Sequence, residues 1–271
     1  MDDLLHNTQL IDKLIAISKE AGEAILKVYN SDFDYQIKED LSPLTKADTL
    51  SHHIICKRLA VLTPDIPILS EEDSDIPFNI RSQWKQYWLV DPLDGTKEFI
   101  KKNGEFTVNI ALIENNIPIL GAIYIPVSDE IFWGTKRYGS FYKNKNQDIE
   151  RINVSKNIYS PIRIITSRSH PYPKLDSLLK EIKDYEVISR GSSLKFCLIA
   201  KGDADFYPRF GPTSEWDIAA GDAIVRFAGG YVLNTNGLTI KYNCNPDFII
   251  PNFIALSSKI IFNKYYKNKI K

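Results

Sequence analysis

The chain has 271 residues, of which 44% are hydrophobic, and its 34 basic residues (Lys and Arg) balance 34 acidic ones (Asp and Glu). This length and apolar content suit one large domain or two modest ones. Without a net basic field, nucleic acid is not expected as a partner. The three cysteines lie far apart, which argues against a disulfide framework or a zinc site. Neither a signal peptide nor an apolar run of the roughly 20 residues that span a membrane is visible, so we expect a cytoplasmic protein.

The first half of the chain predicts helices laid on an antiparallel sheet. Apolar residues from Leu10 to Val28 recur at spacings of three and four, which predicts an amphipathic opening helix. A second helix is expected to follow Asp48 and to end at Pro64. Strands are expected before residue 70 and over 88–91. From residue 106 the apolar positions alternate, and hairpins are predicted to connect further strands over 119–126, 130–135 and 139–143.

The second half predicts alternating strands and helices. Strands are expected over 163–166, 186–189 and 231–234, and helices over 192–201 and 216–227, which indicates an α/β arrangement. We therefore expect two halves, residues 1–150 and 151–271. The basic tail over 259–271 is expected to be a solvated end, and weak contact with a membrane surface is the alternative.

The most informative motif is the run from Asp91 to Thr96, Asp-Pro-Leu-Asp-Gly-Thr, at the end of an apolar strand. It holds two carboxylates, Asp91 and Asp94, three residues apart, and such acids repel one another unless a cation lies between them. A hard divalent ion with carboxylate and carbonyl ligands resolves that conflict. The alternative is a polar loop that caps a helix. The full strand-and-turn context favours a metal site.

Two further acidic positions complete a metal site. Glu71, with two acidic neighbours, follows the apolar run 66–69, so its carboxylate is expected where a strand ends. Alone, such a run is typical of an exposed surface. Asp217 opens a helix of small residues, where it is either a simple N-cap or part of a helix end that holds a phosphate or a metal-bound anion. The three signals in this order predict one site.

These motifs resemble a known family. Glu71-Glu72, the Asp91–Thr96 run and Trp216-Asp217-x-x-Ala-Gly are similar to the signatures of the lithium-sensitive, magnesium-dependent inositol monophosphatase superfamily. Segments 91–106, 167–170, 191–197 and 207–212 resemble its branch of CysQ-type 3′(2′),5′-bisphosphate nucleotidases, over roughly residues 10–253. The resemblance implies a layered αβαβα sugar-phosphatase fold with the active site between the halves. Residues 1–150 would then form an α+β metal-binding half, and 151–271 an α/β nucleotide-binding half.

The resemblance also implies a reaction. It is hydrolysis of the 3′-phosphate of adenosine 3′,5′-bisphosphate (PAP) to AMP and phosphate, with 3′-phosphoadenylyl sulfate (PAPS) as a second substrate. A phosphate monoester is dianionic and repels hydroxide, and two or three Mg²⁺ ions would neutralise that charge. No side-chain nucleophile is needed, which suits a chain with only 4 His.

The metal ligands implied by the resemblance come from both halves. They are Glu71, Asp91 and the Leu93 carbonyl for a first ion, and Asp91, Asp94 and Asp217 for a second. With the ions in place, the residues that meet the reacting phosphate are Glu71, Leu93, Asp94, Gly95, Thr96 and Asp217.

The resemblance also implies which residues bind the reacting phosphate and orient the attacking water. Gly95 and Thr96 would offer an amide and a hydroxyl to the phosphate, and Asp48 would pair with Thr107 to orient the water. The catalytic set is then Asp48, Glu71, Thr96 and Thr107. From the residues alone, Thr107 would be only a strand former.

Substrate choice is expected in the second half. Ser167 and His170 follow a strand and would hold the 5′-phosphate, although His170 alone would be an ordinary surface histidine. Gly191, Ser192 and Lys195 would do the same from a helix N-terminus. Arg209 is expected to face the nucleotide.

Two other functions stay open. An inositol monophosphatase or another sugar-phosphate phosphatase would use the same metal core, and the motifs at 167–170 and 191–195 disfavour it. A non-catalytic phosphonucleotide sensor would be expected to lack one of the metal carboxylates, and all are present. Location at the cytoplasmic face of the inner membrane is the alternative to the cytoplasm, and the oligomeric state is open.

Overall fold

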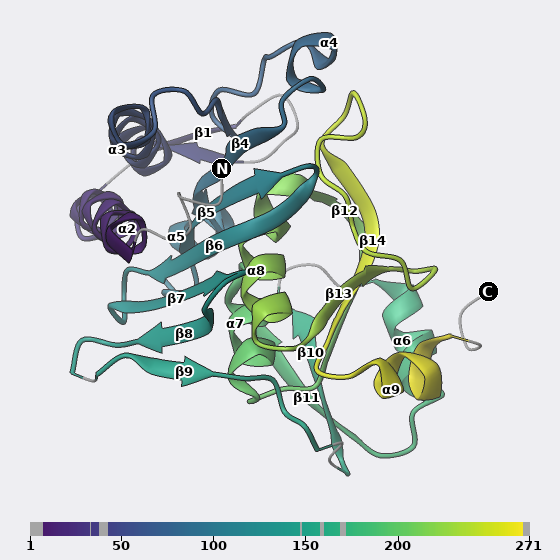
Figure 1. Ribbon diagram of the computed structural model, residues 1–271. Coiled ribbons are helices and arrows are strands. Elements are labelled where there is room, and N and C mark those ends of the chain that lie inside the picture. The colour runs from purple at the N-terminus through teal and green to yellow at the C-terminus, as the bar shows by residue number, and fades with distance from the viewer. Residues whose placement is uncertain are drawn as a thin grey trace.

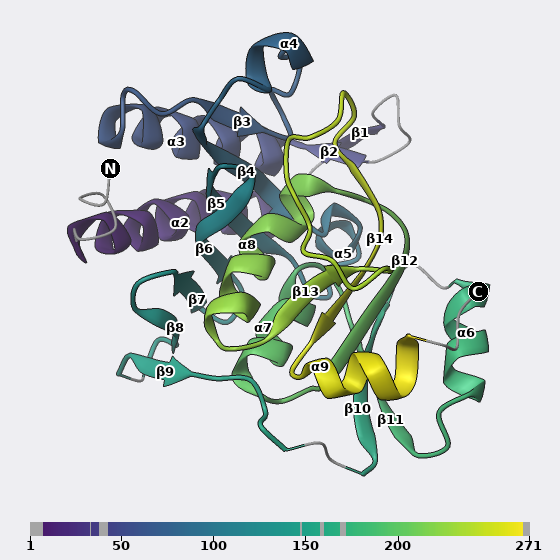
Figure 2. The same ribbon diagram turned by 45° about the vertical axis from the view of Figure 1, so that its right-hand side comes forward.

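The computed structural model describes residues 8–32, 34–37, 43–146, 148–157, 160–168 and 172–267. Helices and sheets alternate in five layers, as Figures 1 and 2 show from two directions. The expected αβαβα order is confirmed.

The first two layers come from the first half of the chain. Helices α2 (Thr8–Tyr29) and α3 (Lys46–Leu62) cover one face of a seven-stranded sheet. Its strands, in spatial order, are β3 (Ile68–Ser70), β4 (Gln86–Asp94), β5 (Thr107–Glu114), β6 (Ile117–Ile125), β7 (Glu130–Thr135), β8 (Gly139–Lys143) and β9 (Glu150–Ile152). Among the described strands of this sheet, β3 and β4 pair in parallel and the other neighbours pair antiparallel. Apolar side chains of α2, such as Leu14 and Ile25, are buried against this face, as their helical spacing predicts.

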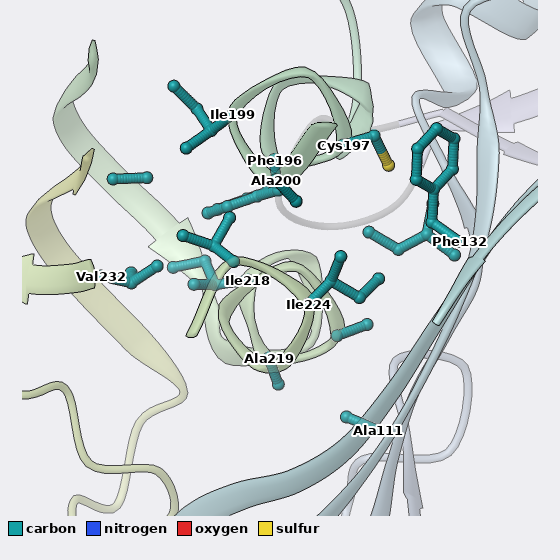
Figure 3. Close-up of a cluster of buried hydrophobic side chains, with 14 of the residues drawn as sticks. Ala111, Phe132, Phe196, Cys197, Ile199, Ala200, Ile218, Ala219, Ile224 and Val232 are labelled. Carbon is teal, nitrogen blue, oxygen red and sulfur yellow. The ribbon is translucent and has the colours of Figure 1, made fainter. Parts of the chain in front are cut away.

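Two helices form the central layer. α7 (Leu194–Lys201) and α8 (Glu215–Phe227) lie between the sheets, and Figure 3 shows Cys197 of α7 and Ile224 of α8 on the side that faces Phe132 of the first sheet. The helix approaches closely at Gly121 of β6, where an added Cβ would lie 2.5 Å from the carbonyl oxygen of Ala220. A larger residue at Gly121 would push the layers apart.

The last two layers come from the second half. The five-stranded sheet has the order β11 (Tyr185–Arg190), β10 (Ile162–Ser167), β12 (Phe206–Ser214), β14 (Ile249–Leu256) and β13 (Tyr231–Asn234). Its outer face is covered by α6 (Pro173–Lys180), α9 (Lys259–Ile261) and a π-helical turn (Phe262–Tyr266). Smaller elements are the hairpin β1 (Tyr35–Ile37) and β2 (Pro43–Thr45), and helices α4 (Phe78–Arg81) and α5 (Thr96–Ile100).

Most predicted elements are confirmed, and two expectations change. Strands β12 and β14 were not predicted. The prediction that the basic tail is a solvated end is wrong for the first part of the tail, because Ile261, Phe262 and Tyr266 are buried against the second sheet. The division near residue 150 stays a prediction; β9 ends the first sheet there, yet one apolar core joins both halves. Within the described residues, no helix is long and apolar enough to cross a membrane.

Candidate active site

A cavity of about 210 Å³ opens where residues of both halves meet. Most of the predicted site residues line it: Glu71, Asp91, Leu93, Asp94, Gly95, Thr96, Ser167, Gly191, Ser192, Lys195, Arg209 and Asp217. His170 lies outside the described residues. The structure therefore brings together segments separated by up to half the chain.

An irregularity in strand β4 places Asp91 and Asp94 in the same cavity. In a regular strand, residues three apart point to opposite faces. Asp91 pairs with Asn109 and Asp94 pairs with Thr107, so β4 has one residue more than β5 over this interval. That extra residue is a β-bulge, which restores both carboxylates to one side. Because of the bulge, two acids that are three residues apart in a strand both face the cavity.

Three carboxylates form a cluster in the cavity. Glu71, Asp91 and Asp217 each offer an oxygen, and these atoms lie within 4.8 Å of one another. Burial, followed by repulsion from Glu71 and then from Asp94, raises the pKa of Asp91 well above its ordinary value. Burial also raises the pKa of Asp217 well above its usual range, with Asp94 and Glu71 adding to it. A hard divalent cation fits this oxygen set and removes the repulsion.

The fourth predicted carboxylate has polar partners beside the cluster. Asp94 accepts a hydrogen bond of 3.4 Å from the Asn109 side-chain amide. Burial raises its pKa, and the nearby Lys195 ammonium lowers it. Lys195 is itself buried, and the loss of hydration lowers its pKa to about 8, with Asp94 opposing the shift. A cation thus lies next to these carboxylates at the start of α7.

Two predicted site carboxylates, Asp48 and Asp217, lie in the first turns of helices, where each takes part in a capping box. At the start of α3, the Asp48 carboxylate accepts from the Thr45 amide at 2.8 Å and from its hydroxyl at 2.7 Å. At the start of α8, Asp217 accepts from the Ser214 amide at 3.2 Å. Asp217 is therefore an N-terminal cap partner and a cluster member at once. The positive end of α8, whose Asp217 and Ile218 line the cavity, favours an anion here.

The hydroxyl of Thr96 lies between two site oxygens. It is 3.5 Å from the Asp48 carboxylate and 3.4 Å from the Leu93 carbonyl, both long for hydrogen bonds. Just before it, Gly95 has a φ of 90°, and an added Cβ would lie 2.9 Å from the Glu105 carbonyl. Only glycine makes this turn without strain. The turn delivers the Thr96 hydroxyl to the cavity.

Thr107 takes part in a buried hydrogen-bond network. It is fully buried, and its hydroxyl is hydrogen-bonded to the Ser193 hydroxyl at 2.7 Å and to the Asn109 side chain at 3.1 Å. The Thr96 hydroxyl lies 3.5 Å from the Asp48 carboxylate. The pairing of Asp48 with Thr107 stays a prediction.

Several supporting residues were missed from the sequence. Asn109 and Ser193 hold Thr107 and each other, with 2.8 Å between the Ser193 hydroxyl and the Asn109 oxygen. Asn109 shares its strand face with Thr107 at a spacing of two, so the alternation could have found it. No local pattern marks Ser193 as its partner.

An aromatic wall of the cavity was also missed. Phe196 and Phe253 stack with centroids 5.7 Å apart, Tyr207 packs edge-on against both, and all three line the cavity. Lys195 Nζ lies 5.5 Å from the Tyr207 ring centre. Arg209 is nearly buried, and its Nε donates to the Thr213 hydroxyl at 2.8 Å. This side of the cavity combines apolar surface with two cations.

Comparison with known proteins gives the same family throughout. A sequence profile of the inositol monophosphatase family matches residues 6–269. The chain is 45% identical over 246 residues to the 3′(2′),5′-bisphosphate nucleotidase CysQ of Salmonella typhimurium, covering 90% of this chain and 98% of that protein. It is 46% identical over 264 residues to the protein of the same name from Buchnera aphidicola, covering 93% and 96%.

A solved structure agrees in fold. The crystal structure of CysQ from Bacteroides thetaiotaomicron, described as a bacterial member of the inositol monophosphatase family, superposes with a TM-score of 0.78 at 38% identity. The match covers 90% of this chain and 96% of that one. The family is metal-dependent, and the carboxylate cluster described above fits that requirement. This chain belongs to the inositol monophosphatase family.

Proposed function

We propose that this protein is a 3′(2′),5′-bisphosphate nucleotidase that hydrolyses the 3′-phosphate of PAP to AMP and phosphate, and that also accepts PAPS. The observation that carries the proposal is one cavity lined both by a carboxylate cluster and by the cationic side chains of Lys195 and Arg209. Relatives named for this activity share 45–46% of the sequence over most of the chain.

The metal side would hold Mg²⁺, in two or three ions. Glu71, Asp91, Asp217 and the Leu93 carbonyl line one cavity and supply hard oxygen ligands, and Asp94 lies beside them. When bound, the ions neutralise phosphate charge and lower the pKa of water. All other roles belong to side chains and amides of this chain.

Orientation of the attacking water falls to Asp48 and Thr96. The Asp48 carboxylate is held by Thr45 and can accept a proton, and the Thr96 hydroxyl is near enough to relay it. Thr107, at the start of β5, supports this region through its hydrogen bonds with Ser193 and Asn109. Amides at the starts of α5 and α8 would stabilise the phosphate charge as it develops.

The nucleotide side would bind the part of the substrate that does not react. Lys195, Gly191, Ser192 and Ser167 line the same cavity as the carboxylate cluster and suit a second phosphate. The aromatic wall offers apolar surface to a nucleoside. Binding energy from this side can orient the reacting ester.

A phosphate-release assay tests the proposal. The substrates are PAP, PAPS, 3′-AMP and inositol 1-phosphate, each with Mg²⁺ and with a chelator. We expect the highest kcat/KM with PAP and no turnover without metal. Preference for inositol 1-phosphate would indicate an inositol monophosphatase instead, and nucleotide binding without turnover would indicate a sensor.

Two threonine variants locate the water. Thr96→Val should lower kcat for PAP and 3′-AMP alike, with little change in KM, because it removes a hydroxyl needed only when the water attacks. If Thr107→Val has the larger effect on kcat, the water is oriented by Thr107 and the assignment to Thr96 is wrong.

A further inference from the structure

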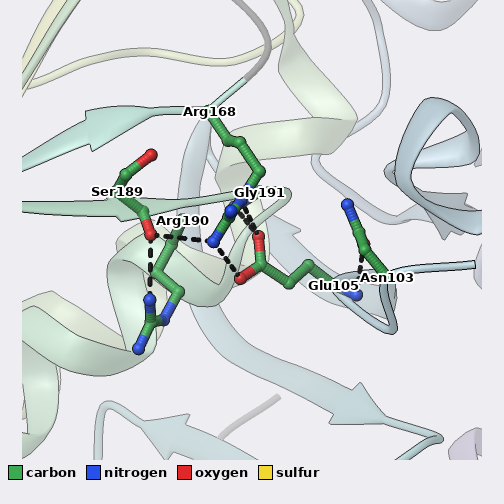
Figure 4. Close-up of polar contacts among 6 residues, drawn as sticks. All are labelled: Asn103, Glu105, Arg168, Ser189, Arg190 and Gly191. Atoms are coloured by element: carbon green, nitrogen blue, oxygen red, sulfur yellow. Dashed lines mark hydrogen bonds and ion pairs between the residues drawn. The ribbon is translucent and has the colours of Figure 1, made fainter. Parts of the chain in front are cut away.

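A two-pronged ion pair joins the two halves of the molecule beside the cavity. Arg168 follows β10, and Glu105 precedes β5. Arg168 Nε and Nη2 each donate to one Glu105 carboxylate oxygen at 2.8 Å. Figure 4 shows the pair with its neighbours Gly191, Ser189 and Arg190.

The same carboxylate also holds the loop that leads into α7. The Gly191 amide donates to Glu105 Oε2 at 2.7 Å, and Arg168 Nη2 reaches the Ser189 carbonyl at 3.3 Å. Glu105 therefore contacts the residue that follows β10 and the residue that follows β11, at the carboxyl ends of these two parallel strands. Two of the residues in contact with this pair or next to it line the cavity. Ser167 directly precedes Arg168, and Gly191 donates its amide to Glu105.

The backbone of Glu105 fills the space between the two sides of the cavity. A Cβ added to Gly95 would lie 2.9 Å from the Glu105 carbonyl oxygen, and one added to Gly191 would lie 3.2 Å from it. Gly95 belongs to the metal side and Gly191 to the nucleotide side. The separation of these two cavity loops is thus set by direct packing on Glu105.

Stability alone does not account for this pair. The Arg168 side chain is 45% exposed and that of Glu105 is 16% exposed, and such ion pairs contribute little to folding. Their two-pronged geometry instead fixes relative orientation. Arg58 and Glu20 form a similar fork at 2.9 Å between α3 and α2, and neither lines the cavity.

We propose that Glu105 and Arg168 act as a latch that positions Ser167 and the Gly191–Lys195 segment against the metal side, and so sets affinity for the non-reacting phosphate of the substrate. The inference rests on the proposed nucleotidase function. Both are positioning residues, because their atoms act through Gly191 and Ser167.

The test compares Glu105→Ala, Arg168→Ala and the double variant with Arg58→Ala as a matched control. KM and kcat are measured for PAP and for 3′-AMP, which lacks the 5′-phosphate. We expect each latch variant to raise KM for PAP about tenfold and to change 3′-AMP kinetics less than twofold. The double variant should be no worse than the singles, because the two residues act as one unit. Arg58→Ala should leave both substrates unchanged.

The Glu105→Ala result separates a latch from direct phosphate binding by Arg168. Removing Glu105 frees the Arg168 guanidinium, so direct binding predicts tighter PAP binding in Glu105→Ala and weaker binding in Arg168→Ala. A latch predicts weaker binding in both. Opposite effects would overturn the proposal, as would equal losses on PAP and 3′-AMP.

Hydrogen–deuterium exchange gives a readout that needs no turnover. Peptides covering residues 189–197 should exchange faster in both latch variants than in the wild type and in Arg58→Ala. Unchanged exchange would overturn the latch even if the wild type hydrolyses PAP. If the wild type does not hydrolyse PAP, the proposed function fails, and the exchange data still decide whether the latch orders this segment.

Discussion

Replacing Asp91 by Asn tests whether the carboxylate cluster is built for cations. Asp91 is almost fully buried, and its oxygen lies within 4.8 Å of those of Glu71 and Asp217. Asn keeps the shape of the side chain and an oxygen that can accept a hydrogen bond from the Leu93 amide. In the wild type this amide donates to the Asp91 carboxylate at 3.1 Å. The substitution therefore removes charge with little change in packing.

The expected gain in stability follows from the repulsion that is removed. Two unit charges 4.8 Å apart repel by about 3.5 kcal/mol at an effective dielectric constant of about 20. Partial protonation already relieves some of this, because burial and the neighbouring acids raise the pKa of Asp91. We expect Asp91→Asn to raise the free energy of unfolding of the metal-free protein by about 2 kcal/mol, which is on the order of 5 °C in Tm.

The sign of the pH dependence follows from the same raised pKa. The folded protein keeps a proton on Asp91 at pH values where the unfolded chain has lost it. Stability of the metal-free wild type should therefore fall as pH rises from about 4 through the raised pKa of Asp91. The Asp91→Asn variant lacks this contribution, so its advantage should grow toward neutral pH.

Thermal unfolding with chelator and with Mg²⁺, from pH 5 to 8, measures these effects. Mg²⁺ should raise the Tm of the wild type and have a much smaller effect on Asp91→Asn, whose activity should be lost. Asp205→Asn is the matched control, because Asp205 accepts from Arg163 at 2.7 and 2.9 Å. The control should be destabilised and keep its Mg²⁺ response. If Asp91→Asn is less stable without metal and gains as much from Mg²⁺ as the wild type, the cluster is not the metal site.

Three further predictions concern single residues. Asp94→Asn should reduce phosphate release at saturating Mg²⁺ at least about a hundredfold, roughly 2.7 kcal/mol of barrier, and retention of most activity would remove Asp94 from the ligand set. Because burial lowers the pKa of Lys195 to about 8, its charge is lost above that pH, so KM for PAP should climb there in the wild type. Lys195→Arg should abolish the climb, and identical pH profiles would contradict the phosphate role. Gly121→Ala should lower the free energy of unfolding by about 2 kcal/mol in urea, since its Cβ would lie 2.5 Å from the Ala220 carbonyl, and an unchanged midpoint would contradict this.

The sequence by itself determined the periodic elements and the residue types of the site. Apolar spacing located helix α2 and strands β6 to β8, because side-chain periodicity is a short-range property. The chemistry of clustered acids and the resemblance of the motifs pointed to Glu71, Asp91 and Asp217, which the structure brings within 4.8 Å. Strand β14 was missed because its register depends on pairing with β12 and β13.

Tertiary structure alone decided how these residues meet. The bulge that turns Asp91 and Asp94 to one side is visible only in the register of β4 against β5. The Glu105 contacts with Arg168 and Gly191 span 63 and 86 residues of sequence, and neither partner has a local pattern that announces the other. Such contacts depend on how the layers pack around α8, because packing, and not local propensity, sets the distance between segments far apart in the chain.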